Sequence, residues 1–136
     1  MVVLDDVGWQ DVGFHDSSSF FHTPHINRLA SEGVELTAFY ASQQCTPARS
    51  QLMTGRYKYK VGMQDFLIRS TEPRGVPLEN TLLPEKMLEA GYQTAMVGKW
   101  RLGFHMKAYT PTERGFEHHY GVYVGEGGHF THLSNR

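Results

Sequence analysis

The chain has a single cysteine, no long apolar run and almost no net charge. With Cys45 alone, an internal disulfide framework and zinc sites built on Cys-x-x-Cys pairs are excluded. No stretch is apolar over the length that a bilayer requires, so we expect no membrane span. The formal net charge of −1 gives no sign of a surface that binds nucleic acid or membrane.

Length and composition are those of a modest folded domain. The 136 residues are 40% hydrophobic and 20% charged, which is enough for a core. Val2, Val3 and Leu4 run directly into Asp5 and Asp6, a pattern typical of a buried strand and not of a signal peptide. Because no closing element follows the other end, we expect residues 1–136 to be part of a larger domain, truncated at both ends.

Strand and helix patterns alternate along the chain. Three strands and three helices are expected, the strands over residues 2–6, 34–41 and 93–97, and the helices over residues 23–33, 46–54 and 81–90. Residues 57–80 are polar and irregular, and the tail from residue 103 has no clear assignment. The alternation predicts an α/β fold with a mostly parallel sheet flanked by helices.

Cys45 opens the run Cys-Thr-Pro-Ala-Arg-Ser at the start of an expected helix. Pro47 suits the first turn of this helix and Gly55 suits its C-terminal cap. Residues four apart on a helix lie about 5–6 Å apart, which places Arg49 beside Cys45. The helix N-terminus also favours anions. The run therefore indicates a site for chemistry on an oxyanion, and the alternative is a buried structural thiol.

Charged residues also stand at the ends of two expected strands. Asp5 and Asp6 would repel each other unless a cation lay between them, and oxygen ligands favour Ca²⁺ or Mg²⁺; the alternative is a pair that caps a loop. Lys99 follows the strand expected over residues 93–97, where it either contacts a bound anion or pairs with a surface carboxylate.

Several of these segments together resemble one family. The run from Cys45 to Arg56 is similar to the signature of the type I sulfatases. Three other blocks and the N-terminal strand resemble further family segments, namely residues 2–15, 23–26, 91–100 and 111–116. The residues and spacing of these motifs are most similar to those of the arylsulfatase B group, the N-acetylgalactosamine-4-sulfatases. The resemblance implies an alkaline-phosphatase-like α/β fold, of which this chain is the N-terminal portion.

The resemblance also implies a mechanism and a set of site residues. In this family a formylglycine-generating enzyme oxidises the signature cysteine to formylglycine, whose hydrate attacks sulfur beside Ca²⁺ and later expels sulfate. Cys45 would be the precursor of that nucleophile and, with Asp5 and Asp6, a calcium ligand. Arg49 would steady the hydrate, and Lys99 would bind the sulfate group. The implied substrates are aryl sulfates or sulfated glycosaminoglycan sugars, and the implied location is lysosomal or secreted.

Two departures from the family pattern bear on activity. The family block Gly-Lys-Trp-His-Leu-Gly has Arg101 in place of its histidine, and arginine cannot act as a base near neutral pH. Arg101 can still hold sulfate, but we expect slow turnover. The later Asp-Asn metal pair has no matching block, so calcium would lack several of its six to eight oxygens. A catalytically inactive relative is therefore the second hypothesis.

A cysteine-dependent phosphatase is the third hypothesis and the weakest. Such enzymes place five residues between cysteine and arginine, whereas three separate Cys45 from Arg49. The histidines offer no stronger alternative: His118 and His119 are expected in a polar surface loop. The six others are expected to be structural or exposed, namely His15, His22, His25, His105, His129 and His132.

Overall fold

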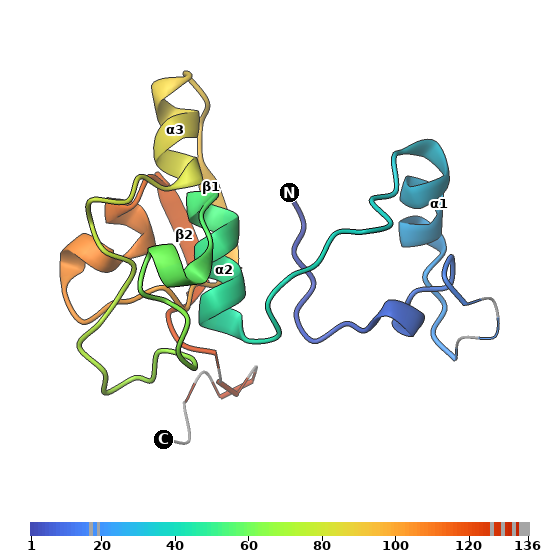
Figure 1. Ribbon diagram of the computed structural model, residues 1–136, viewed down its shortest axis with the longest axis horizontal. Coiled ribbons are helices and arrows are strands. Elements are labelled where there is room, and N and C mark those ends of the chain that lie inside the picture. The colour runs from blue at the N-terminus through green and yellow to red at the C-terminus, as the bar shows by residue number, and fades with distance from the viewer. Residues whose placement is uncertain (17, 19, 126, 129, 132, 134–136) are drawn as a thin grey trace. The chain divides into compact units, whose positions relative to one another are not determined.

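The computed structural model describes residues 1–136 apart from 17, 19, 126, 129, 132 and 134–136. The chain forms two compact units, residues 1–40 and residues 41–136. Figure 1 shows the first unit in blue to teal and the second in green to red.

The first unit contains one α-helix and one short 3₁₀ helix. Helix α1 spans Pro24–Glu32 and the 3₁₀ helix η1 spans Trp9–Asp11. Proline at the first position of α1 has no N–H to lose there, and Gly33 ends the helix. The helix expected over residues 23–33 is therefore confirmed.

Two expected strands of the first unit are absent, and these predictions were wrong. Residues 2–6 and 34–41 are irregular in structure, and Val2 and Val34 are 85% and 88% exposed. An apolar run becomes a strand only when a neighbouring strand completes its hydrogen-bond ladder. No described residue pairs with either segment in such a ladder, and the apolar side chains therefore remain in solvent.

The helices of the second unit agree with the sequence pattern. Helix α2 spans Cys45–Thr54, the 3₁₀ helix η2 spans Lys58–Lys60, and α3 spans Leu83–Glu89. Gly55 ends α2 in the left-handed conformation, with φ of 65°, and its N–H donates to the Gln51 carbonyl at 2.9 Å. Helix α3 begins later than expected because the Glu85 carboxylate accepts the N–H of Leu82, which makes Leu82 the residue before the helix.

A parallel two-stranded sheet lies beside these helices (Figure 1). Strand β1 spans Ala95–Lys99, two residues later than expected, and β2 spans His118–Val122. Ala95 pairs with His118 and Lys99 with Val122. The connection contains the 3₁₀ helices η3 (Lys107–Tyr109) and η4 (Pro111–Glu113). His118 and His119 thus begin a strand, which corrects their expected place in a surface loop.

The core of the second unit surrounds Trp100, which follows β1 directly and is 1% exposed. Its indole N–H donates to the carbonyls of Gly103 and Tyr109, at 2.9 and 3.0 Å. Seven other buried residues complete this cluster, namely Met53, Val61, Met63, Ile68, Val76, Leu82 and Leu102. Trp100 therefore anchors its neighbours Lys99 and Arg101 to the core, which holds their backbone in place.

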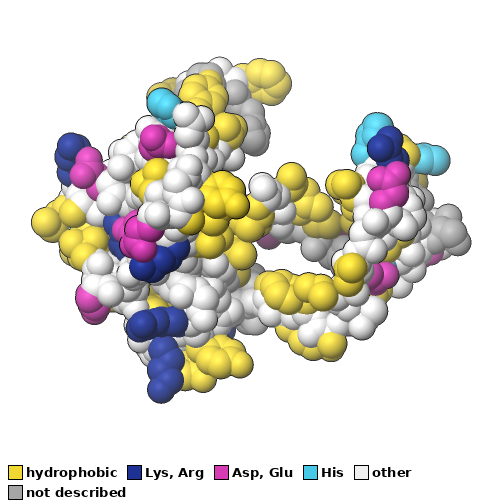
Figure 2. Space-filling view, turned by 90° about the horizontal axis from the view of Figure 1, so that it is seen from above, with side chains coloured by type: hydrophobic (Ala, Val, Ile, Leu, Met, Phe, Trp, Pro, Cys, Tyr) yellow, Lys and Arg dark blue, Asp and Glu magenta, His cyan; other side chains and the backbone are white. Residues whose placement is uncertain are grey.

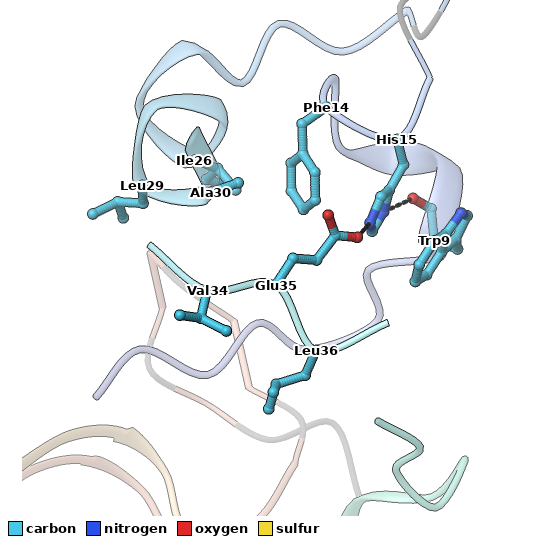
Figure 3. Close-up of a pocket in the computed structure, with 9 residues that line it drawn as sticks. All are labelled: Trp9, Phe14, His15, Ile26, Leu29, Ala30, Val34, Glu35 and Leu36. Atoms are coloured by element: carbon cyan, nitrogen blue, oxygen red, sulfur yellow. Dashed lines mark hydrogen bonds and ion pairs between the residues drawn. The ribbon is translucent and has the colours of Figure 1, made fainter. Parts of the chain in front are cut away.

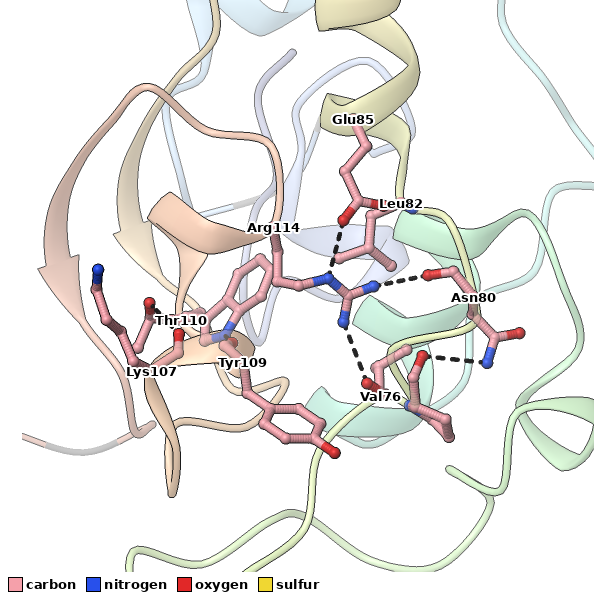
Figure 4. Close-up of polar contacts among 10 residues, drawn as sticks. Val76, Asn80, Leu82, Glu85, Lys107, Tyr109, Thr110 and Arg114 are labelled. Carbon is pink, nitrogen blue, oxygen red and sulfur yellow. Dashed lines mark hydrogen bonds and ion pairs between the residues drawn. The ribbon is translucent and has the colours of Figure 1, made fainter.

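A buried arginine links α3 to the loop before it (Figure 4). Arg114 is 3% exposed, and its guanidinium donates to the carbonyls of Val76 at 3.1 Å and Asn80 at 2.6 Å. Its Nε donates to the Glu85 carboxylate at 3.0 Å. A planar fork with five N–H donors can satisfy three separated acceptors in this way, and a lysine cannot.

Charge is divided unequally between the units. Residues 1–40 contain six acidic residues and one basic residue, Arg28, whereas residues 41–136 contain eight acidic and twelve basic residues. Figure 2 accordingly shows most of the dark blue side chains over the larger unit. In the described part of the chain, none of the helices combines the length and apolar character needed to cross a membrane.

Candidate active site

Cys45 is the first residue of α2 and faces the end of β1. Its side chain is half-buried, and the Lys99 Nζ lies 3.0 Å from its Sγ. Lys99 is the last residue of β1, so the carboxyl end of a strand meets the N-terminus of a helix at this point. Open α/β sheets bind their ligands in this position. Cys45 thus has a cation at hydrogen-bond distance and partial access to solvent.

Hydrogen bonds fix α2 against the residues at the end of β1. The Arg49 guanidinium donates to the Lys99 carbonyl, which joins the first turns of the helix to the strand end. The Thr46 hydroxyl donates to the Arg101 carbonyl at 3.0 Å and accepts the Ile68 N–H at 3.0 Å. Thr46 is completely buried. The geometry around Cys45 therefore depends on a side chain that sequence analysis did not single out.

Replacing Thr46 with valine is expected to destabilise the second unit by about 2–3 kcal/mol. Valine has a similar shape but leaves the Arg101 carbonyl and the Ile68 N–H buried without this partner. Urea unfolding monitored by the fluorescence of the buried Trp100 measures this loss. Thr46→Ser keeps the hydroxyl and should retain most of the stability; equal losses for both variants would contradict the prediction.

Arg101 is held in an uncommon conformation behind the strand end. Its φ is 60°, in the left-handed region, and its side chain is 5% exposed. The Arg101 N–H donates to the Tyr123 carbonyl at 2.9 Å, which extends the pairing of the two strands. A Cβ at Gly125 would lie 2.0 Å from Nη1 of Arg101, so a larger residue there would have to displace the Arg101 guanidinium. Nε of Arg101 is buried and has no hydrogen-bond partner among the described residues.

The arrangement suits an anion at the start of α2. Lys99 supplies a cation at the Cys45 sulfur, and the helix N-terminus adds the partial positive charge of its first peptide groups. Arg101 is joined to this helix start through its backbone carbonyl, which accepts the Thr46 hydroxyl, and its buried Nε has no hydrogen-bond partner among the described residues. Chemistry at residue 45 that develops negative charge would therefore be stabilised here.

The two aspartates proposed as metal ligands belong to the first unit. Asp5 and Asp6 are exposed, and Asp6 has a φ of 56°. The structure thus brings Cys45, Arg49 and Lys99 together in the second unit, and the aspartates lie in the other.

The donor chemistry of these aspartates fits a hard cation, but the number of donors does not. Two carboxylates fall short of the six to eight oxygens that Ca²⁺ binds. No group of three or more His, Cys, Asp or Glu side chains in the described ranges is arranged to hold a metal ion. These residues alone do not form a calcium site.

A pocket of about 380 Å³ lies within the first unit (Figure 3). Its polar wall is His15, whose ring stacks on Trp9 with centroids 3.5 Å apart. Nδ1 and Nε2 of His15 lie 2.9 Å from the Trp9 carbonyl and 2.8 Å from the Glu35 carboxylate. Both ring nitrogens thus face acceptors, and His15 has the structural role expected of it. The pocket contains neither Cys45 nor Lys99.

The other histidines do not form a second site in the part of the chain that the structure describes. Nε2 of His119 lies 3.3 Å from the Gly98 carbonyl, and its ring stacks on Tyr123. His105 packs against Tyr109. His129 and His132 lie outside the described residues.

Comparison with known proteins gives a consistent result. The pattern of the family described as Sulfatase matches residues 1–126. Arylsulfatase J of Mus musculus is 47% identical over 131 residues, which are 96% of this chain and 22% of that protein. The crystal structure of Ps i-CgsB has a TM-score of 0.85 at 36% identity and covers 91% of this chain and 27% of its own.

The same neighbour has been solved with an oligosaccharide. The structure of Ps i-CgsB in complex with k-i-k-neocarrahexaose has a TM-score of 0.76 at 31% identity, over 91% of this chain and 27% of its own. The chain therefore spans about a quarter of the length of these relatives, and its α/β fold is that of the corresponding part of a sulfatase. The chain belongs to the sulfatase family.

Proposed function

We propose that this protein hydrolyses sulfate esters through a formylglycine derived from Cys45. The observation that carries the proposal is the Lys99 Nζ at 3.0 Å from the Cys45 Sγ, at the N-terminus of α2, in a member of the sulfatase family. The sulfur stands where an oxygen of the hydrated aldehyde would lie. That hydrate supplies a nucleophile and a route for release of sulfate without attack by water.

The residues around position 45 have separate roles in this proposal. Lys99 holds an oxygen of the sulfate group and stabilises negative charge on it in the transition state. Arg49 fixes the end of β1 through the Lys99 carbonyl and so sets the position of that ammonium group. Arg101 adds positive charge but accepts no proton, because guanidinium does not deprotonate in proteins.

The wider proposal follows the family. Residues 1–136 are part of one sulfatase catalytic domain, in which Asp5 and Asp6 supply two oxygen ligands to Ca²⁺. The substrate class is a sulfated sugar, including those of glycosaminoglycans as for arylsulfatase B, or an aryl sulfate. The oligosaccharide bound to Ps i-CgsB supports a sugar. A formylglycine-generating enzyme would modify Cys45, and the protein would be lysosomal or secreted.

A second candidate function is that of an inactive relative, and Arg101 is the observation that favours it. A side chain that carries a fixed charge cannot move the proton that re-forms the aldehyde. The site would then bind sulfate esters and turn them over slowly or not at all.

Modification of Cys45 tests the first proposal directly. After expression in a secretory cell, peptide mass spectrometry over residues 45–56 is expected to find an aldehyde at position 45. Arg49→Ala should abolish the modification and Arg56→Ala, outside the Thr46–Arg49 signal, should not. A free thiol in all three proteins would contradict the proposal. Aldehyde without hydrolysis of aryl sulfate would identify the inactive relative.

A further inference from the structure

A basic and aromatic surface follows the C-terminus of α2, opposite the end that carries Cys45. It consists of Arg56, Tyr57, Lys58, Tyr59 and Lys60 and is referred to as the Arg56–Lys60 surface. Ten helical residues at about 1.5 Å each place it roughly 15 Å along α2 from Cys45. The proposed sulfatase chemistry uses none of its residues.

Two parallel tyrosine rings form the apolar part of this surface. Tyr57 and Tyr59 are 68% and 59% exposed, and their ring centroids lie 5.5 Å apart with planes inclined by 6°. Lys60 extends over the Tyr59 ring, with its Nζ 6.0 Å from the centroid. Because the two rings stack on each other, the pair offers its outer surface and ring edges to solvent as a small apolar platform on which a ligand can pack.

The platform is held in place by its own backbone. The Lys58 N–H donates to the Gln51 side chain at 3.2 Å, and the Lys58 carbonyl accepts the Met63 N–H at 2.8 Å. Val61 and Met63 are 2% and 4% exposed and anchor the end of the segment in the core. A surface ordered in this way loses little conformational entropy when it binds a ligand.

The charges of the surface are all positive, and one of them, the Arg56 guanidinium, also donates to the Asn80 side chain at 3.2 Å. Three basic side chains alternate with the two tyrosines, and no acidic residue interrupts them. In the described part of the chain, Lys58 and Lys60 form no ion pair, whereas Lys86 and Lys107 pair with Glu89 and Glu113. This density of Lys and Arg in a short segment is typical of sites that bind polyanions such as heparin.

We propose that the Arg56–Lys60 surface is a second binding site for a sulfated polysaccharide, separate from the site at Cys45. The tyrosine rings stack against the apolar faces of sugar rings, and the ammonium and guanidinium groups pair with sulfates on the same chain. The choice of a sulfated glycan over a nucleic acid rests on the proposed function, since a sulfatase meets this polymer as its substrate.

Binding of a labelled heparin oligosaccharide to the full chain tests the inference. Lys58→Gln with Lys60→Gln is expected to weaken binding on the order of tenfold and to lower the salt dependence of log Kd by about one unit per lysine. Tyr57→Ala with Tyr59→Ala should weaken binding by a similar factor and leave the salt dependence unchanged, because only stacking is lost. All four side chains are exposed or partly exposed, so the fold should tolerate these changes.

The matched control is Lys86→Gln with Lys107→Gln, which removes the same charge from other exposed positions and should leave binding unchanged. Equal weakening by the control, or equally tight binding of a desulfated oligosaccharide or of oligothymidylate, would overturn the inference. Cys45→Ala should bind heparin as the unaltered chain does. A protein that binds heparin through the Arg56–Lys60 surface but has no aldehyde at position 45 would contradict the proposed sulfatase function. The same result would still support the second binding site.

Discussion

Replacing Arg101 with histidine in the full-length protein is expected to raise kcat for an aryl sulfate about a hundredfold. Positioned acid–base groups contribute about 10²–10⁴ to such reactions, and histidine is able to move the proton that arginine cannot. The structure tolerates the exchange. Histidine accepts the left-handed φ of 60° better than most residues, and the change removes a buried Nε without a described partner.

The control for this prediction is Arg101→Gln, which removes the charge and provides no base. Both variants remove the buried Nε that has no described partner, but only histidine can transfer a proton. Only the histidine variant should therefore gain a rate that depends on pH. The rate should rise as the imidazole loses its proton, and kcat measured across the pH range reports this. Equal rates for the two variants, or no gain over arginine, would refute a proton-transfer role at position 101.

Loss of the Arg114 side chain is expected to cost the second unit about 3 kcal/mol or more. Arg114→Met keeps the apolar stem but leaves the Val76 and Asn80 carbonyls without their donors. Glu85 also loses its ion-pair partner and retains some access to solvent, since its side chain is 27% exposed. The reduction in the free energy of unfolding is measurable by urea titration.

Fluorescence can isolate this unit because the two tryptophans differ. Trp100 is buried in the second unit and Trp9 is exposed in the first, so a Trp9→Phe background reports Trp100 alone. Arg114→Lys should lose less stability than methionine, because one ammonium reaches some of the three acceptors. A loss below about 1 kcal/mol for Arg114→Met would show that water replaces the lost donors.

Local signals predicted the helices of this chain well. Pro24 begins α1 and Gly33 follows its last residue, and Gly55 ends α2 at a left-handed φ of 65° that glycine adopts readily. The contact of Lys99 with Cys45 agrees with the family resemblance, which assigns both residues to one sulfate site, but the sequence pattern alone left the partner of Lys99 open. The helix predictions needed only information from neighbouring residues.

Features that depend on distant partners were not predictable in this way. Residues 2–6 have the composition of a strand, but no described segment supplies their ladder. Strand β2 is the opposite case. Its His-His-Tyr-Gly-Val sequence has little strand character, and the segment is a strand because it pairs with β1. The roles of Thr46 and Gly125 at the site also rest on contacts with Arg101, 55 and 24 residues away in the chain.

The complete burial of Thr46 and Pro47 determines whether modification of Cys45 can come before or after folding. Both side chains belong to the segment that a modifying enzyme would read, and both are out of reach once α2 has packed. An enzyme that modifies Cys45, as proposed, would therefore have to act on the nascent or unfolded chain, in competition with folding of the second unit. A variant that folds faster would leave more of the protein with its original thiol.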